Sequence, residues 1–296
     1  MLSHITNMFK KSSWEHLRIP FSYYLMPVFW FALSSATEAK FANVLIVGII
    51  LHLFLYPSSN GYNSYFDKDE KSIGGLKNPK KVTIGLYYLS LVFFGIALLG
   101  ALMINISFFV MVLLYGLVSM AYSHPSIRLK KYPYLSWLTA GFFQGAITFI
   151  MCVIGLLEGD LNNILNWDLL LPALFTTLLL LGSYPLTQVY QHEEDKKRGD
   201  ITLSLKLGIM GTFNFASIWF IIAGGTFIWY FNHIGSAWAI WWFLGSMAPL
   251  VIFFFIWFSL VKKNPNKYAN HSMAMTMNKI SASTLNFFFI YYYLAQ

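Results

Sequence analysis

The stretch FANVLIVGIILHLFLYPSSNGYNSYFDKDEK, residues 41–71, joins a long apolar run to a segment with five charged side chains. A helix that crosses a bilayer needs about 20 mostly apolar residues, and the apolar run over 40–57 approaches that length. Polar and charged residues follow this run directly. The stretch therefore predicts a membrane span that ends in a charged segment at the membrane surface.

The composition of the whole chain points the same way. Of the 296 residues, 57% are hydrophobic and 11% are charged, whereas a soluble domain carries about 25% charged residues. The one cysteine, Cys152, lies in an apolar run, which excludes a secreted disulfide scaffold. This composition also excludes a disordered chain and a nucleic-acid-binding protein. We expect a single polytopic membrane domain over 1–296, with the lipid bilayer and not nucleic acid as its partner.

Nine apolar runs along the chain are candidates for membrane spans. They predict an all-α membrane protein with nine transmembrane helices. The leader before the first run lacks the apolar core and the cleavage site of a signal peptide, so we expect this run to be retained as a span. The nine runs are 20–36, 40–57, 82–104, 106–122, 134–157, 167–188, 211–231, 237–261 and 280–295.

The basic residues alternate with these runs. Nineteen of the 20 Lys and Arg flank the same ends of the runs, and Lys40 is the exception. Because cytoplasmic loops carry an excess of Lys and Arg, we expect an integral, multi-pass protein of the cell or inner membrane. Its N-terminus is then cytoplasmic and its C-terminus lies on the opposite side. The basic surface would attract anionic headgroups or diphosphates.

The acidic residues are concentrated in two segments. Seven of the 12 Asp and Glu lie in 60–71 and 187–200, each following an apolar run. Both segments repeat one layout, an amide followed four residues later by an aspartate, which places the two side chains on one helix face. The simpler alternative is a solvated helix end. The two pairs are Asn63 with Asp67, and Gln191 with Asp195.

Oxygen-rich segments of this kind suit Mg²⁺, which proteins hold with one or two carboxylates together with substrate phosphates. Two such faces could bridge one diphosphate through the metal, while nearby Lys and Arg add positive charge. A zinc site is disfavoured because the seven His are dispersed and no Cys/His set has ligand spacing. The pattern therefore indicates a magnesium-diphosphate site.

Taken together, these segments make the chain similar to the UbiA superfamily of intramembrane prenyltransferases over essentially its whole length. The resemblance implies nine helices around a cytoplasmic-side active-site cavity. It also implies Mg²⁺-dependent transfer of a prenyl group from a prenyl diphosphate to a small acceptor. The acceptor is commonly aromatic, such as a quinone or pigment precursor, and a lipid acceptor stays open. The matching segments are the two acidic segments, GDITLSLKLG (199–208), YSHPSIRLKK (122–131) and LRIPFSYYLMP (17–27).

Carried over by position, the resemblance assigns a catalytic set of five residues. In the first motif Asn63 and Asp67 match, and Lys71 occupies the third position where the family has Asp. In the second motif Gln191 occupies the first Asp position and Asp195 matches the last. Asp69, Glu70 and Glu194 are alternative carboxylates, and Lys71 is an alternative diphosphate contact. The candidate metal ligands are therefore Asp67, Asp69, Glu70, Glu194 and Asp195.

Basic and aromatic residues near the motifs are candidates for substrate binding, although each taken singly is explained by topology or packing. Gln144 and Thr148, one turn apart, are candidates for the acceptor pocket or for an interhelical hydrogen bond. Gly74 and Gly75 are candidates for a mobile lid. The candidate substrate-binding residues are Arg18, Lys77, Arg128, Lys130 and Tyr190.

Three competing functions remain open. A transporter or channel would place ionisable groups near the middle of its spans, whereas these acids lie at span ends. A phospho-alcohol transferase would carry an Asp-Gly-Ala-Arg-type signature, which is absent. The third alternative is a non-catalytic or repurposed family member that binds an isoprenoid or a partner membrane enzyme, and Lys71 and Gln191 motivate it.

Overall fold

The computed structural model describes residues 7–159 and 166–296. Within these ranges the chain is a bundle of helices, with one isolated antiparallel bridge between Ile73 and Leu76. The predicted all-α class is therefore confirmed for the described part of the chain.

Seven helices in the described ranges are long and apolar enough to cross a membrane, so the chain is an integral, multi-pass membrane protein. Two of them combine α-helical segments with a central π-helical segment. The seven are α4–η2–α5 (Phe41–Ile49, Ile50–Leu55, Tyr56–Asp67), α6 (Ile84–Leu102), α7 (Ile106–Ser123), α8–η4–α9 (Pro133–Phe142, Phe143–Ile147, Thr148–Leu157), α11 (Trp167–Leu186), α13 (Leu203–His233) and α14 (Ala237–Lys263).

The two other predicted spans have a different character. Run 20–36 folds as the 3-10 helix η1 (Ile19–Leu25) followed by the nine-residue helix α3 (Met26–Ser34). Run 280–295 is the second half of α16 (His271–Leu294), whose first half carries polar residues. The count of nine spans thus stays a prediction, and seven are supported by length and composition.

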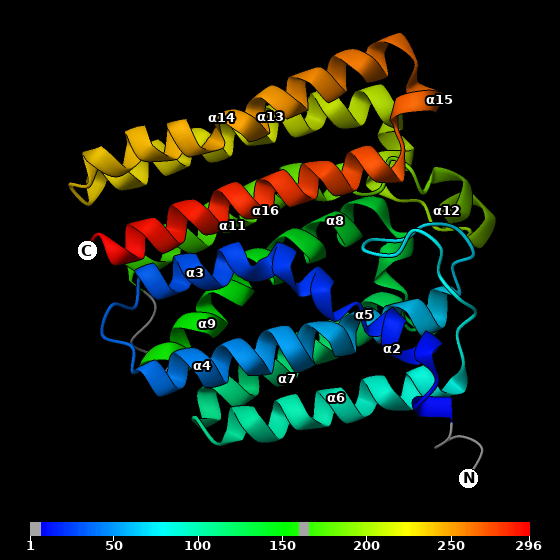
Figure 1. The fold of residues 1–296 in the computed structure, drawn as a ribbon, viewed down its shortest axis with the longest axis horizontal. Coiled ribbons are helices and arrows are strands. Elements are labelled where there is room, and N and C mark those ends of the chain that lie inside the picture. Colours follow the sequence, from blue (N-terminus) through cyan, green and yellow to red (C-terminus); the bar gives the residue numbers. More distant parts are fainter. Residues whose placement is uncertain (1–6, 160–165) are drawn as a thin grey trace.

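The bundle has two distinct ends (Figure 1). The loop between α5 and α6 lies at one end with the short helices α2 (Lys11–Leu17), α12 (His192–Arg198) and α15 (Pro265–Tyr268). The 3-10 helix η3 (Leu129–Lys131) follows α7. At the opposite end, Lys40 forms an ion pair with Glu158 at 3.1 Å. The basic and acidic segments of the sequence therefore meet at a single end of the bundle.

Helix α11 is central to the packing. It contacts α13, α8 and η4, while α3 packs against α16 and α9. In the core, the ring of Phe31 on α3 stacks on Phe289 of α16 with centroids 4.2 Å apart. Large apolar side chains such as Ile221, Trp241 and Phe255 remain exposed on α13 and α14, as expected of a lipid-facing surface.

Candidate functional site

The first acidic motif is presented by the last turns of α5. The Lys130 ammonium donates to the Asn63 side-chain oxygen at 3.1 Å and also to Asp67. One cation therefore contacts both side chains, which is the shared helix face that their spacing predicts. Helix α5 then ends at Lys68, whose φ of 52° turns the chain into the loop that carries Asp69.

The second acidic motif lies on the short helix α12, which begins directly after Gln191 and ends at Gly199, with a φ of 74°. Asp195 is buried and accepts hydrogen bonds from Arg198 at 2.8 Å and from the Thr202 hydroxyl at 3.2 Å. Thr202 also caps the next helix, α13, by accepting from the Leu205 N–H. This local network holds Asp195 in place.

Arg198 joins the two motifs. Its guanidinium donates to Asp69 from the first motif, to Asp195 at 2.8 Å, and to Asp200 at 3.3 Å. Arg128 makes a two-pronged contact with Asp200, at 2.8 Å for each bond, and approaches Asp67 at 3.6 Å. We call these side chains the ion-pair network: Asp67, Asp69, Asp195, Asp200, Arg128, Lys130 and Arg198.

Burial makes the charge state of the acids sensitive to their partners. It raises the pKa of the Asp195 carboxyl to about 6, against the opposing effect of Arg198. The pKa of Asp69 is raised by burial and by the neighbouring Asp67 carboxylate, while Arg198 lowers it. Two carboxylates in one buried space favour an additional positive charge between them, as a cation or a basic side chain would supply.

Arg18 is a buried basic residue that does not belong to the ion-pair network. Its guanidinium donates only to backbone carbonyls, at 3.0 Å to Gly74 and 3.3 Å to Asn60, and its Nε has no partner. Within the described residues no carboxylate lies in ion-pair range of it. Because a buried charge without a counter-ion is costly, Arg18 favours an anionic ligand.

A cavity of about 920 Å³, including its open mouth, collects these groups. We call it the charged cavity. Its lining includes eight of the candidate catalytic, metal-binding and substrate-binding residues, drawn from both acidic segments, from the residue before η1 and from η3. The eight are Arg18, Asn63, Asp67, Asp69, Lys130, Tyr190, Gln191 and Asp195.

The other predicted site residues lie outside the lining of this cavity. Lys71 is exposed and pairs with Glu193, and Glu194 pairs with Lys197 at 3.7 Å. Glu70 and Lys77 are exposed in the loop after α5. Arg128 lies behind the cavity wall, where it holds Asp200 and Asp67.

Sequence reasoning missed two members of the ion-pair network as site residues. Arg198 was counted only as one of the basic residues that determine topology, and Asp200 only as one of the clustered acids. The i, i+3 spacing of Asp195 and Arg198 on a helix was the available signal. No sequence signal links Arg198 to Asp69, since 129 positions separate them.

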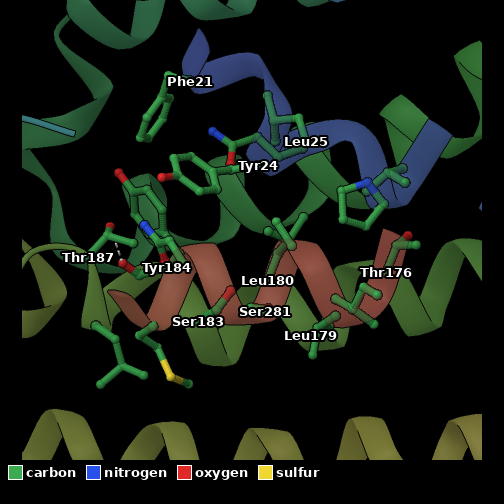
Figure 2. Close-up of a pocket in the computed structure, with 18 of the residues that line it drawn as sticks. Phe21, Tyr24, Leu25, Thr176, Leu179, Leu180, Ser183, Tyr184, Thr187 and Ser281 are labelled. Atoms are coloured by element: carbon green, nitrogen blue, oxygen red, sulfur yellow. Dashed lines mark hydrogen bonds between the residues drawn. The ribbon is translucent and has the colours of Figure 1, made fainter. Parts of the chain in front are cut away.

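An apolar cavity of about 1300 Å³, including its open mouth, adjoins the charged cavity. The two share Phe21, Gln144, Tyr184 and Thr187 in their linings. Figure 2 shows Phe21, Tyr24 and Leu25 on one side, and along the other Thr187, which follows α11, and side chains of α11 as far as Thr176. At 1.5 Å per helical residue, this lining extends roughly 17 Å along α11.

A third cavity, the polar cavity, encloses about 780 Å³ including its mouth between α5, α7, α8 with η4, and α11. Gln144 lines all three cavities. Thr148 lines none of them, and its hydroxyl donates to the Phe143 carbonyl at 2.6 Å. Of this predicted pair, only Gln144 therefore faces an open space.

The loop with Gly74 and Gly75 lies over η1. A Cβ atom on Gly74 would come within 2.8 Å of the Phe21 ring, so only glycine fits here without a shift. The loop is tied down by Arg18 and by His271, whose ring contacts the Ile73 carbonyl at 2.9 Å. Ile73 and Gly74 thereby form part of the wall of the charged cavity.

The donor set of the charged cavity fits Mg²⁺ held jointly with a phosphate ligand. Carboxylates of Asp67, Asp69 and Asp195 line it together with the amides of Asn63 and Gln191. In the described ranges no three acidic, His or Cys side chains are close enough to hold a metal by themselves. Mg²⁺ usually takes one or two carboxylates and completes its shell with waters and substrate phosphates, which this arrangement permits.

The profile of the UbiA prenyltransferase family matches residues 24–280. No curated protein matches the chain at a significant level.

Several solved structures share the fold. A UbiA homolog from Archaeoglobus fulgidus bound to DMAPP and Mg²⁺ aligns with a TM-score of 0.67 at 15% identity, over 97% of this chain and 100% of that one. The apo structure of a UbiA homolog from Aeropyrum pernix K1 aligns with a TM-score of 0.68 at 16% identity, over 90% and 97% of the two chains. A structure of digeranylgeranylglyceryl phosphate synthase aligns with a TM-score of 0.62 at 20% identity, over 97% and 99%.

Proposed function

The chain belongs to the UbiA prenyltransferase family, and from this premise we propose that it transfers a prenyl group from a prenyl diphosphate to an aromatic acceptor, with Mg²⁺ as cofactor. The observation that carries the proposal is the junction of the charged cavity with the apolar cavity through Phe21, Gln144, Tyr184 and Thr187. A ligand with an anionic head and an apolar tail matches such a pair of adjoining spaces. Structures of the Archaeoglobus fulgidus homolog bound to DMAPP or GPP with Mg²⁺ support the same substrate class.

The diphosphate is assigned to the charged cavity. Arg18 has no carboxylate partner and so offers its guanidinium to one phosphate, and Lys130 offers an ammonium to the other. Asp67 with Asn63, and Asp195 with Gln191, would hold the metal from the two motifs. When bound, Mg²⁺ supplies positive charge that stabilises the departing diphosphate. The contact between Asp69 and Arg198 connects the two motifs and holds these groups at fixed positions relative to one another.

The transfer itself requires heterolysis of the allylic C–O bond. The bond's electron pair leaves on the diphosphate, where Arg18 and Lys130 stabilise the developing charge. A ring carbon of the acceptor then forms the new C–C bond with its π electrons. The ring proton passes to the departing diphosphate, which restores aromaticity. Tyr184 and Phe21 at the cavity junction present aromatic rings toward the position where the allylic cation forms.

We extend the proposal to the arrangement in the membrane. The chain forms one polytopic domain over 1–296 with nine spans, a cytoplasmic N-terminus and a charged cavity that opens toward the cytoplasm. The gathering of the basic loops at one end of the bundle supports this orientation. The bilayer excludes water from the apolar cavity, which protects the cation from hydrolysis.

The test is binding of tritiated geranyl diphosphate by the purified protein in lipid nanodiscs, with Mg²⁺ or with EDTA. We expect Mg²⁺-dependent binding, and at least about 100-fold weaker binding by an Asp67→Asn, Asp195→Asn double variant. That factor follows from the loss of two charge-assisted contacts of about 1.5–3 kcal/mol each.

The matched control neutralises two acids outside the cavity lining, Glu70→Gln and Glu194→Gln, and should bind as the wild type does. An equal loss of geranyl diphosphate binding in both double variants would show that Asp67 and Asp195 are not the specific metal ligands. No binding by the wild type at any prenyl chain length would favour the non-catalytic alternative that Lys71 and Gln191 suggest.

A further inference from the structure

Two primary amides that line the polar cavity make no side-chain hydrogen bond to the described residues. They are Asn60 on α5 and Gln144 on η4. Both are partly buried, and both line the polar cavity and the apolar cavity. In a bilayer-spanning bundle water is scarce, so an unpartnered amide costs free energy unless a ligand satisfies it.

Four neighbouring hydroxyl groups are paired with one another. Ser59 pairs with Ser119 across α5 and α7, and Tyr122 pairs with Tyr184 across α7 and α11. These four hydroxyls also line the polar cavity. The two amides remain available there, together with the hydroxyls of Tyr115 and Thr139.

A π-helical segment turns Gln144 toward the cavities. In η4, the freed Ala146 N–H donates to the Thr177 hydroxyl of α11 at 3.0 Å. A π-helical insertion in a helix frequently marks a functional position. Gln144 lines the charged, apolar and polar cavities alike, so it borders the place where the diphosphate head and the prenyl tail would join.

The polar cavity offers no carboxylate to a cationic ligand among its described lining residues. Arg18 is the only cation there, and the proposed function assigns it to the diphosphate in the charged cavity, which it also lines. The remaining wall includes the rings of Tyr115, Phe143, Tyr122 and Tyr184, and aromatic walls suit a flat ring. An amide both donates and accepts, as a phenolic hydroxyl does.

We propose that Asn60 and Gln144 form the acceptor subsite and bind the hydroxyl groups of a neutral, hydroxylated aromatic ring in the polar cavity. This inference rests on the proposed function and narrows its acceptor to a phenol without a carboxylate. The bound ring lies next to the allylic carbon, with its hydroxyls held by the amides. The hydroxyls direct electron density to the adjacent ring carbon, which forms the C–C bond with the allylic cation after the C–O bond to diphosphate has broken. The ring proton leaves with the diphosphate.

The experiment uses tritiated resorcinol with the nanodisc-embedded full chain, both as a direct binding assay and as acceptor with geranyl diphosphate. We expect Gln144→Leu and Asn60→Leu each to weaken resorcinol binding and raise its KM about tenfold, the effect of losing one buried hydrogen bond. A melting temperature unchanged from that of the wild type shows that the variants fold. Gln144→Asn, which keeps the amide, should recover part of the lost affinity.

Thr148→Val is the matched control, because Thr148 lies one turn from Gln144 and lines no cavity. It should leave resorcinol binding unchanged. The inference is overturned if Gln144→Leu and Asn60→Leu bind resorcinol as the wild type does, or if the wild type binds no resorcinol. It is also overturned if only 4-hydroxybenzoate is prenylated, since Arg18 would then bind the carboxylate. Failure of the wild type to bind geranyl diphosphate would instead reject the proposed function.

Discussion

At the residue scale, one guanidinium organises the site. Arg198 contacts Asp69 from the first motif and Asp195 and Asp200 from the second. All three carboxylates are buried. A buried ion pair adds little net stability compared with apolar packing, but removing one partner leaves uncompensated charge. Arg198 is therefore the side chain on which the joining of the two motifs depends.

We predict that Arg198→Gln lowers the thermal stability of the detergent-solubilised protein strongly. Loss of one partner from a buried network costs about 3–5 kcal/mol. Added Mg²⁺ should restore part of this loss, because the freed carboxylates are its preferred ligands. The measurement is the melting temperature with and without Mg²⁺.

The control is Lys197→Gln on the same helix. Lys197 is 68% exposed and pairs with Glu194 at 3.7 Å, so its removal should cost at most about 1 kcal/mol. Similar melting temperatures for the two variants would show that the network contributes no more than a surface pair.

At the element scale, two spans contain a π-helical segment, and one of these segments brings a side chain to the cavities. Segment η2 ends two residues before Pro57, which has no backbone N–H to donate. Segment η4 contains Gln144 and Gly145 and packs against α11. Trp137 on α8 also donates to the Leu181 carbonyl of α11 at 2.8 Å. The contacts of η4 and Trp137 hold the span α8–η4–α9 against α11 beside the cavities.

We predict that Gly145→Ala destabilises the protein and weakens acceptor binding. The added Cβ would lie 2.6 Å from the Thr177 Cα. Because Thr177 Cα is a backbone atom, relieving this contact would require a shift of helix α11. Overpacking of this kind typically costs about 1–3 kcal/mol. Melting temperature and resorcinol binding report the two effects.

Gly225→Ala on α13 is the comparison, since nothing lies within 4 Å of the Cβ it would add. There alanine should be neutral or should stabilise the helix by up to about 1 kcal/mol. If Gly145→Ala behaves like Gly225→Ala, the close approach of η4 to α11 is not required.

At the scale of the whole molecule, the bundle has one reactive end. The basic loops, both motifs and the short helix α12 lie there, whereas Lys40 and Glu158 lie at the other end. The positive-inside rule predicts that this end faces the cytoplasm. With the nine spans that we propose, the C-terminus would lie on the opposite side.

We predict that Ser72→Cys is labelled by a membrane-impermeant maleimide only from the cytoplasmic side, and Gln296→Cys only from the opposite side. The single native cysteine, Cys152, is buried and should give no background. Right-side-out and inside-out vesicles allow the two sides to be compared.

Labelling of both positions from the same side would mean an even number of spans and would exclude nine. Labelling of Ser72→Cys from outside alone would reverse the orientation and place the charged cavity away from the cytoplasm.

The sequence by itself determined the membrane class, the two acidic motifs and the family. Apolar runs and the alternation of basic loops are patterns along the chain, and the bilayer imposes both directly. The spacing of Asn63 and Asp67 likewise predicts a shared helix face, because one helical turn is a local property.

Only the tertiary structure decided which charged and polar residues reach the cavities. It placed Lys130 and Arg198 at the charged cavity, and left Lys71, Lys77 and Glu70 outside its lining. It also brought Asn60 to the same cavity as Gln144. Lipid is as apolar as a protein core, so hydrophobic periodicity does not tell a lipid-facing side from an inward-facing one. Contacts between distant segments, such as Asp69 with Arg198, arise only when the helices pack.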